Sequence, residues 1–245
     1  MFRFQGVESC VRICEEYKEA GMITFDHVTE RAFQLYFDKR EYRTTLGNWK
    51  TYDYDSQTIN IMPEGFQHAT TAWEFGQLLT RWAPQHERNL LRACGTANYP
   101  LNTRTKKPDG AWQPRDDQNR WPSLVVEVAK TESQSSLMDD VRFWICQSER
   151  NVQVVLSIKI KPGSIDFKKW KYNPKNPEQP ACTQYMKIVR DASLTSSKVG
   201  AANPNRFFFS YKELTRKSEE PGQDCSGFTI TKEQAIQLAE TIWSV

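Results

Sequence analysis

The chain has 245 residues, a formal net charge of +3 and a charged fraction of 26%, so it is long enough to bury a substantial core and has the composition of a globular protein. No apolar run approaches the ~18–20 residues of a membrane span, and the N-terminal stretch lacks the apolar segment of a secretory signal. The cysteines are scattered and contain no CxxC pair. We therefore expect reduced thiols in an intracellular protein, cytoplasmic or nuclear, without a membrane partner.

Apolar spacing in the N-terminal part predicts two helices and a hairpin. Apolar positions between Val7 and Cys14 recur at helical spacing, and Phe25–Asp38 is read as a second helix. Apolar and polar residues then alternate through Trp49–Pro63, on both sides of a polar Asp-Ser pair, which is typical of a hairpin.

A third helix is expected from Pro63 to about Trp82. One stripe of this helix is formed by His68, Ala72, Phe75, Leu79 and Trp82. His68 therefore points with the apolar residues toward the expected sheet. A lone histidine on such a face is usually a core residue, so the core and the ligand interpretations both stay open. Glu64, four positions earlier, lies near the same face, or it simply favours the positive helix N-terminus.

The remaining pattern alternates strands and helices. The expected elements are strands near Gly110–Gln113 and Ser123–Ala129, a helix over Leu137–Ser148, strands over Val152–Ile160 and Ile165–Tyr172, and a closing helix over Ile230–Trp243. This order predicts an α/β (α+β) protein with a central mixed sheet flanked by helices. We expect residues 1–180 to form the main domain, including the N-terminal helices. Residues 181–245 would be a C-terminal extension packed on it.

Glu127 interrupts the apolar strand "PSLVVEVAK". A strand this apolar is buried on both faces, and an ionised carboxylate there costs several kcal/mol unless it is compensated. An ion pair or a metal could compensate it. If the neighbouring strand supplies Asp109 from "KPDGAW", two acids converge and a cation between them would relieve their repulsion. Such oxygen donors suit Mg²⁺ or Mn²⁺.

The order "IMPEGFQH", "KPDGAW", "PSLVVEVAK", "LMDDVRFW" resembles the Uma-type family of restriction-endonuclease-like proteins in the PD-(D/E)XK superfamily, including related fungal proteins. The resemblance spans roughly residues 24–160. It implies a restriction-endonuclease-like core and a metal-dependent endonuclease that hydrolyses phosphodiester bonds in DNA or RNA. By position, it implies that Asp109 and Glu127 hold Mg²⁺ or Mn²⁺. Val128 would add its backbone carbonyl and His68 a further ligand.

The lysine of the family pattern is out of register here. The pattern is acid-x-Lys, because residues two apart share one face of a strand, whereas Lys130 follows Glu127 by three positions. A bulge could turn Lys130 toward the site, where it would orient or activate the water; otherwise it is an exposed lysine at the strand end. Gln134 is a polar candidate for the same orienting role. The alternative function is a catalytically inactive module of this fold that binds nucleic acid or protein.

Basic residues gather before Asp109 and again after Ile158. The candidate phosphate contacts are Arg104, Lys106, Lys107, Lys159, Lys161, Lys168 and Lys169. Contacts of this kind would be independent of sequence, which makes nucleic acid the predicted partner. A solvated sheet edge protected by lysines is the alternative. Association into a homodimer stays open.

Overall fold

The chain divides into two compact units. The computed structural model describes residues 1–17, 22–38, 48–62, 66–82, 90–95, 97–101, 103–130, 133–190, 206–218 and 227–244. The first unit consists of Met1–Phe66 and Ala97–Pro108, and the second of Gln67–Thr96 and Asp109–Val245.

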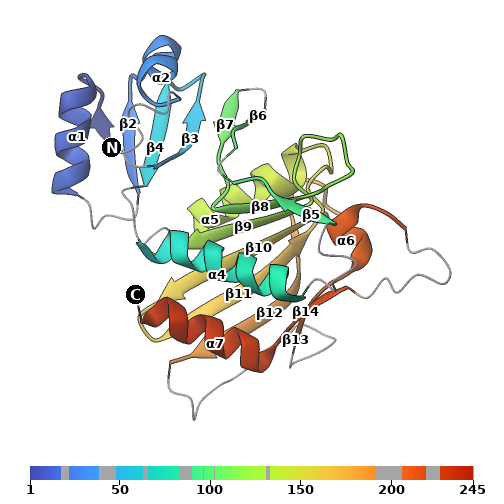
Figure 1. Cartoon of the computed structure of the whole chain (residues 1–245). Coiled ribbons are helices and arrows are strands. Elements are labelled where there is room, and N and C mark those ends of the chain that lie inside the picture. Colours follow the sequence, from blue (N-terminus) through green and yellow to red (C-terminus); the bar gives the residue numbers. More distant parts are fainter. Residues whose placement is uncertain are drawn as a thin grey trace. The chain divides into compact units, whose positions relative to one another are not determined.

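The first unit is a sheet that carries two short helices (Figure 1). Its elements are β1 (Phe2–Arg3), α1 (Val7–Glu16), β2 (Ile23–Asp26), α2 (Glu30–Tyr36), β3 (Asn48–Asp53), β4 (Thr58–Met62), β6 (Tyr99–Leu101) and β7 (Arg104–Lys106). The strand order is β1-β2-β4-β3-β7-β6. Buried aromatic side chains fill its core, with the rings of Phe33 and Tyr52 stacked at 4.0 Å.

The helix expected over Phe25–Asp38 is wrong in its first part. Phe25 is a fully buried residue of β2, and α2 begins only at Glu30. Between them, His27 has a left-handed backbone with φ of 57°, and the Thr29 side chain caps the helix by accepting from the N–H of Ala32. Apolar residues continue at helical spacing across β2 and α2, so the spacing does not reveal where the strand ends and the helix begins. The expected hairpin is confirmed as β3 and β4.

The second unit is built on a six-stranded mixed sheet in the order β12-β11-β10-β9-β8-β5. These strands are β5 (Leu91–Ala93), β8 (Gly110–Pro114), β9 (Leu124–Ala129), β10 (Val154–Lys161), β11 (Ser164–Lys171) and β12 (Ala181–Val189). Neighbours are antiparallel except β9 and β10, which run parallel. A parallel pair needs a crossover, and α5 (Gln134–Arg142) followed by a π-helical turn, η2 (Phe143–Gln147), supplies it.

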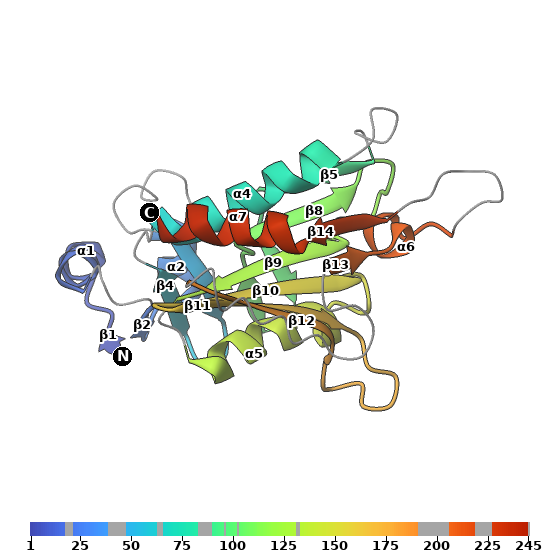
Figure 2. The ribbon, with the colours of Figure 1, turned by 90° about the horizontal axis from the view of Figure 1, so that it is seen from below.

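Helices cover both faces of this sheet. Figure 2 shows α4 (Phe66–Trp82) and α7 (Lys232–Trp243) on one face and α5 on the other. Alternate residues of a strand face opposite sides. Accordingly, Val126 and Val128 of β9 share the apolar core with Phe75 of α4, whereas Glu127 faces η2. The expected α+β architecture, a central mixed sheet flanked by helices, is confirmed.

The C-terminal elements complete the second unit. They are β13 (Arg206–Phe209), α6 (Tyr211–Thr215), β14 (Phe228–Thr231) and α7. β13 and β14 pair with each other, and the Thr231 side chain caps α7 by accepting from the N–H of Gln234. The domain boundary expected at residue 180 falls between β11 and β12, which are neighbouring strands of one sheet. Both strands belong to the second compact unit.

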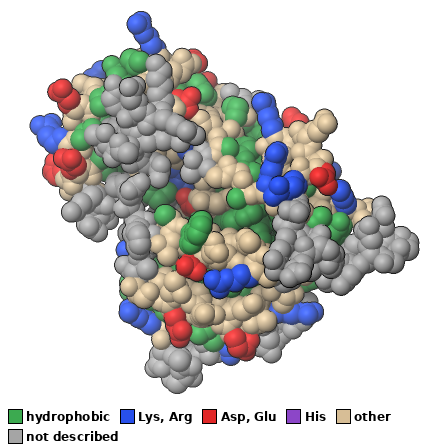
Figure 3. Space-filling view, viewed as in Figure 1, with side chains coloured by type: hydrophobic (Ala, Val, Ile, Leu, Met, Phe, Trp, Pro, Cys, Tyr) green, Lys and Arg blue, Asp and Glu red, His purple; other side chains and the backbone are tan. Residues whose placement is uncertain are grey.

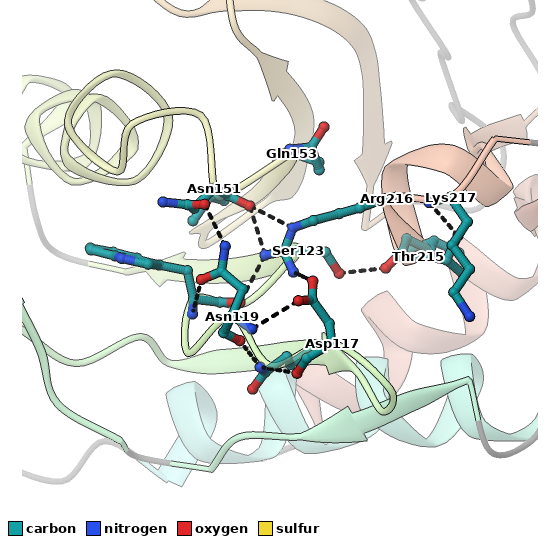
Figure 4. Close-up of polar contacts among 12 residues, drawn as sticks. Asp117, Asn119, Ser123, Asn151, Gln153, Thr215, Arg216 and Lys217 are labelled. Atoms are coloured by element: carbon teal, nitrogen blue, oxygen red, sulfur yellow. Dashed lines mark hydrogen bonds and ion pairs between the residues drawn. The ribbon is translucent and has the colours of Figure 1, made fainter.

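Arg216 ties α6 to two loops of the central sheet (Figure 4). Its guanidinium donates to the carbonyl of Asn151 at 2.7 and 3.0 Å and to that of Trp121 at 2.7 Å, and it forms an ion pair with Asp117. Burial alone would raise the pKa of Asp117, but the N–H of Asn119 and the guanidinium hold it below its ordinary value. The C-terminal part is thereby fixed beside the loop that follows β8.

Across the described ranges, the longest and most apolar helices fall short of what crossing a lipid bilayer requires.

Candidate active site

Asp109 stands directly before β8 and is partly exposed. Its Oδ2 accepts a hydrogen bond of 2.7 Å from the backbone N–H of Val128 in β9. The last register pair of the two strands at this end is Gly110 with Val126. The carboxylate therefore binds β9 just beyond the backbone ladder, in place of a main-chain carbonyl.

Glu127 is completely buried in the middle of β9. Its Oε1 accepts a hydrogen bond from the indole N–H of Trp144 in η2. A hydrogen bond to a buried ionisable group offsets part of the free-energy cost of its desolvation. Trp144 itself is fully buried and lies in the π-helical turn, a local geometry that often occurs at functional sites.

The two acids come from neighbouring antiparallel strands. If the β8–β9 register continues by one residue beyond Gly110 and Val126, Asp109 lies opposite Glu127. Residues directly opposite each other leave a sheet on the same face, with Cβ atoms ~4.5–5.5 Å apart. In that register, the two acids that the sequence singled out would leave the sheet on the same face.

His68 lies on the buried stripe of α4, as its spacing predicted, and is 8% exposed. A Cβ on Gly110 would lie 3.4 Å from the Cβ of Ala72, and one on Gly76 would lie 3.0 Å from the ring of Trp112. The helix therefore passes closely over the start of β8. Because His68 is one helical turn before Ala72, it lies toward the Asp109 end of that strand.

The other residues suggested for catalysis lie at the margins of this group. Lys130 is exposed and follows the last residue of β9, so no bulge within the strand turns it toward Glu127. Gln134 is the exposed first residue of α5. Glu64 lies outside the described residues.

The candidate basic residues of the first unit are buried or paired with an acid. In the first unit, Lys106 and Lys107 are almost completely buried, the Lys107 ammonium lies 3.7 Å from the ring centroid of Trp49, and Arg104 pairs with Asp53. Among the side chains coloured in Figure 3, basic and acidic groups are interspersed on the face shown. Arg104, Lys106 and Lys107 are therefore not a phosphate-binding row.

In the second unit, Lys169 is also removed from solvent. It is 3% exposed and pairs with Glu213 at 2.7 Å, and burial lowers the pKa of its ammonium below the ordinary value. Lys161 is exposed and bound to Asp166, and Lys168 is half-buried near the rings of Trp170 and Tyr185. Lys159 is half-buried on β10. The remaining candidates for phosphate contacts are therefore residues of the β10–β11 hairpin.

The donor types at Asp109 and Glu127 fit a hard divalent cation, because Mg²⁺ and Mn²⁺ favour carboxylate oxygens and keep several waters. Within the ranges that the structure describes, no three His, Cys, Asp or Glu side chains converge as a metal-ligand set. Ligands beyond the two acids would have to come from main-chain carbonyls, water or substrate.

Sequence reasoning missed Trp144 as the partner of Glu127. The helical spacing of Trp144 predicted only a buried side chain. Spacing cannot show that its indole N–H donates to the carboxylate of Glu127 in β9. The order of a buried acid followed by a helix with an inward tryptophan was the available signal.

No protein-family model matches the chain, and no curated protein matches it. Among solved structures, it is similar to a protein from Anabaena variabilis ATCC 29413 that is called a "putative nuclease belonging to DUF820". The TM-score is 0.46 and the identity is 10%, over 79% of this chain and 90% of the other. Similarity at this level leaves the function to be argued from the residues.

Proposed function

We propose that this protein is a metal-dependent endonuclease that hydrolyses phosphodiester bonds in DNA or RNA, with Asp109 and Glu127 as its metal-holding acids. The observation that carries the proposal is the hydrogen bond from the N–H of Val128 to Asp109, which fixes the Asp109 carboxylate beside the residue that follows Glu127. The order of motifs in the sequence supports the same pair.

Asp109 and Glu127 would hold Mg²⁺ or Mn²⁺, with the carbonyl of Val128, water and substrate oxygens as further ligands. Bound there, the ion would polarise the scissile phosphate and lower the pKa of a water molecule. The protein would contribute fixed positions: the N–H of Val128 orients Asp109 and the indole of Trp144 orients Glu127. Such supporting contacts commonly change metal affinity or activity by ~10–100-fold.

The second candidate is an inactive module of the same fold that binds nucleic acid or protein. Two observations favour it: Glu127 is 0% exposed, and Lys130 lies exposed beyond the end of β9. In that case, the Glu127–Trp144 hydrogen bond would be purely structural.

A cleavage assay with isosteric amide variants separates the two candidates. Asp109→Asn keeps an oxygen that can accept from Val128, and Glu127→Gln keeps one that can accept from Trp144, so both should stay folded. Wild-type protein and both variants would be incubated with single- and double-stranded DNA and RNA in Mn²⁺, Mg²⁺ or EDTA. We expect metal-dependent cleavage by the wild type and a loss of at least ~100-fold in each variant.

Asp139→Asn is the matched control, since Asp139 is an exposed acid of α5 paired with Arg142. It should cleave like the wild type, and circular dichroism should show all four proteins folded. Cleavage by no preparation, or equal cleavage by the wild type and both amide variants, would refute the nuclease proposal.

A further inference from the structure

The register between β9 and β10 places a lysine on the face of Glu127. In this parallel pair, Ser157 is the partner of Glu127 and Lys159 is the partner of Ala129. Register partners in adjacent strands leave the sheet on the same face, and so do residues two apart in one strand. Lys159 therefore projects to the face that carries Glu127. This is the face covered by α5 (Figure 2) and contacted by Trp144 of η2.

Ala129 occupies the position that a lysine holds in an acid-x-Lys pattern, about 6.6 Å along the strand from Glu127 at ~3.3 Å per residue. Lys159 lies beside that position, one strand spacing of ~4.8 Å away. Its flexible four-carbon stem reaches about 6 Å, which is enough to cross from β10 to the space above Ala129. Lys130 follows Glu127 by three positions, so in a regular strand it would face the opposite side of the sheet.

We propose that Lys159 of β10, rather than Lys130, supplies the ammonium group of the candidate active site. This assignment rests on the proposed nuclease function and names a residue that the order of sequence motifs does not reveal. Lys159 would donate hydrogen bonds to a non-bridging oxygen of the scissile phosphate.

The surroundings of Lys159 suit this role. Its partner in β11 is Asp166, whose Oδ2 is bound by Lys161 and whose Oδ1 accepts from the hydroxyl of Tyr185 at 2.9 Å. Lys159 is half-buried, and a partly desolvated cation interacts more strongly with a phosphate than an exposed one does.

In the reaction, the oxygen of one water forms a bond to phosphorus while the bond from phosphorus to the leaving oxygen breaks. The water gives up a proton to solvent, and the leaving oxygen takes a proton from solvent. Lys159 stays protonated throughout and stabilises the negative charge on the phosphoryl oxygens, a kind of contact whose removal typically costs ~10²–10³-fold in rate.

The test compares Lys159→Met, Lys159→Arg and Lys130→Met in single-turnover cleavage with Mn²⁺. Methionine keeps the apolar stem of Lys159 and removes the charge. If Lys159→Met does not fold, Lys159→Gln takes its place. We expect Lys159→Met to lose ~100-fold or more in rate, with substrate affinity changed far less. Lys159→Arg should recover part of the rate because the charge returns. Lys130→Met should lose much less than Lys159→Met.

Lys217→Met is the control, since Lys217 is exposed just after α6 and pairs with Asp116; it should cleave like the wild type. If Asp109→Asn and Glu127→Gln abolish cleavage while folded Lys159→Met or Lys159→Gln retains it, the lysine assignment is wrong and the nuclease proposal stands. If the wild type cleaves nothing, both are wrong.

Discussion

Glu127 is the residue on which the proposed chemistry depends. A buried carboxylate in an apolar strand persists only where neighbouring groups compensate for its lost hydration. Trp144 provides one such contact from η2, and Asp109 approaches the next residue of the same strand. The site is therefore held by contacts from two elements on either side of Glu127 in the sequence.

The contact between Trp144 and Glu127 can be measured as a free energy. Trp144→Phe removes the indole N–H but keeps an aromatic ring, and we expect it to lower the free energy of unfolding. In a double-mutant cycle with Glu127→Met, which removes the acceptor oxygens, the coupling should be about 1 kcal/mol or more, because hydrogen bonds to charged groups are worth ~1.5–3 kcal/mol. Urea unfolding of the four proteins measures it. Additivity within ~0.3 kcal/mol would show that the carboxylate gains nothing from the indole.

Among the elements, α6 is attached to the sheet by a buried ion pair. Lys169 of β11 and Glu213 of α6 are both less than one-tenth exposed, and Lys171 adds a second contact to Glu213 at 2.8 Å. Removing one partner of a buried pair typically costs ~3–5 kcal/mol, since the other charge is left behind. This pair, together with Arg216, explains why the C-terminal elements belong to the second unit.

We predict that Glu213→Gln lowers stability by ~3–5 kcal/mol at neutral pH. Burial on its own would raise the pKa of Glu213, but Lys169, Lys171 and the N–H of Ser210 together hold it below its ordinary value of 4.5. A carboxyl with a lowered folded pKa stabilises the protein above its unfolded pKa and loses that effect as pH falls through the folded value. The difference between wild type and variant should therefore be constant above about pH 6 and shrink below about pH 4.5.

Denaturant unfolding at a series of pH values checks this expectation. Asp139→Asn is again the control, because its exposed pair with Arg142 should contribute no more than ~0.5 kcal/mol. A wild-type advantage over Glu213→Gln that persists unchanged to pH 3 would argue against the ionised pair.

At the scale of the whole molecule, periodicity predicted the fold class but not its subdivision. Strong patterns such as the stripe of α4 and the apolar run of β9 are local, so the sequence was enough to place them. The short strands β5, β6 and β7 have only three residues each and show no period. In strand β12 only Met186 and Ile188 are buried, so its sequence shows no long alternating pattern.

The residues of the candidate site were also predictable only where a local pattern marks them. Asp109 and Glu127 follow from motif spacing and burial. The relation between Glu127 and Lys159 depends on the pairing of β9 with β10, which no local pattern encodes. Lys106, Lys107 and Lys169 were misjudged as surface groups because lysine is almost never fully buried, and only tertiary packing reveals the exceptions.

The central claim is that Asp109 and Glu127 form a metal-holding pair, and Mn²⁺ binding tests it most directly. Electron paramagnetic resonance would follow the signal of unbound Mn²⁺ as protein is added, for the wild type and for the folded double variant Asp109→Asn/Glu127→Gln. The account predicts that the wild type binds about one or two ions per chain and that the double variant binds none at the same concentrations. Equal uptake by the two proteins, or none by the wild type, would contradict it.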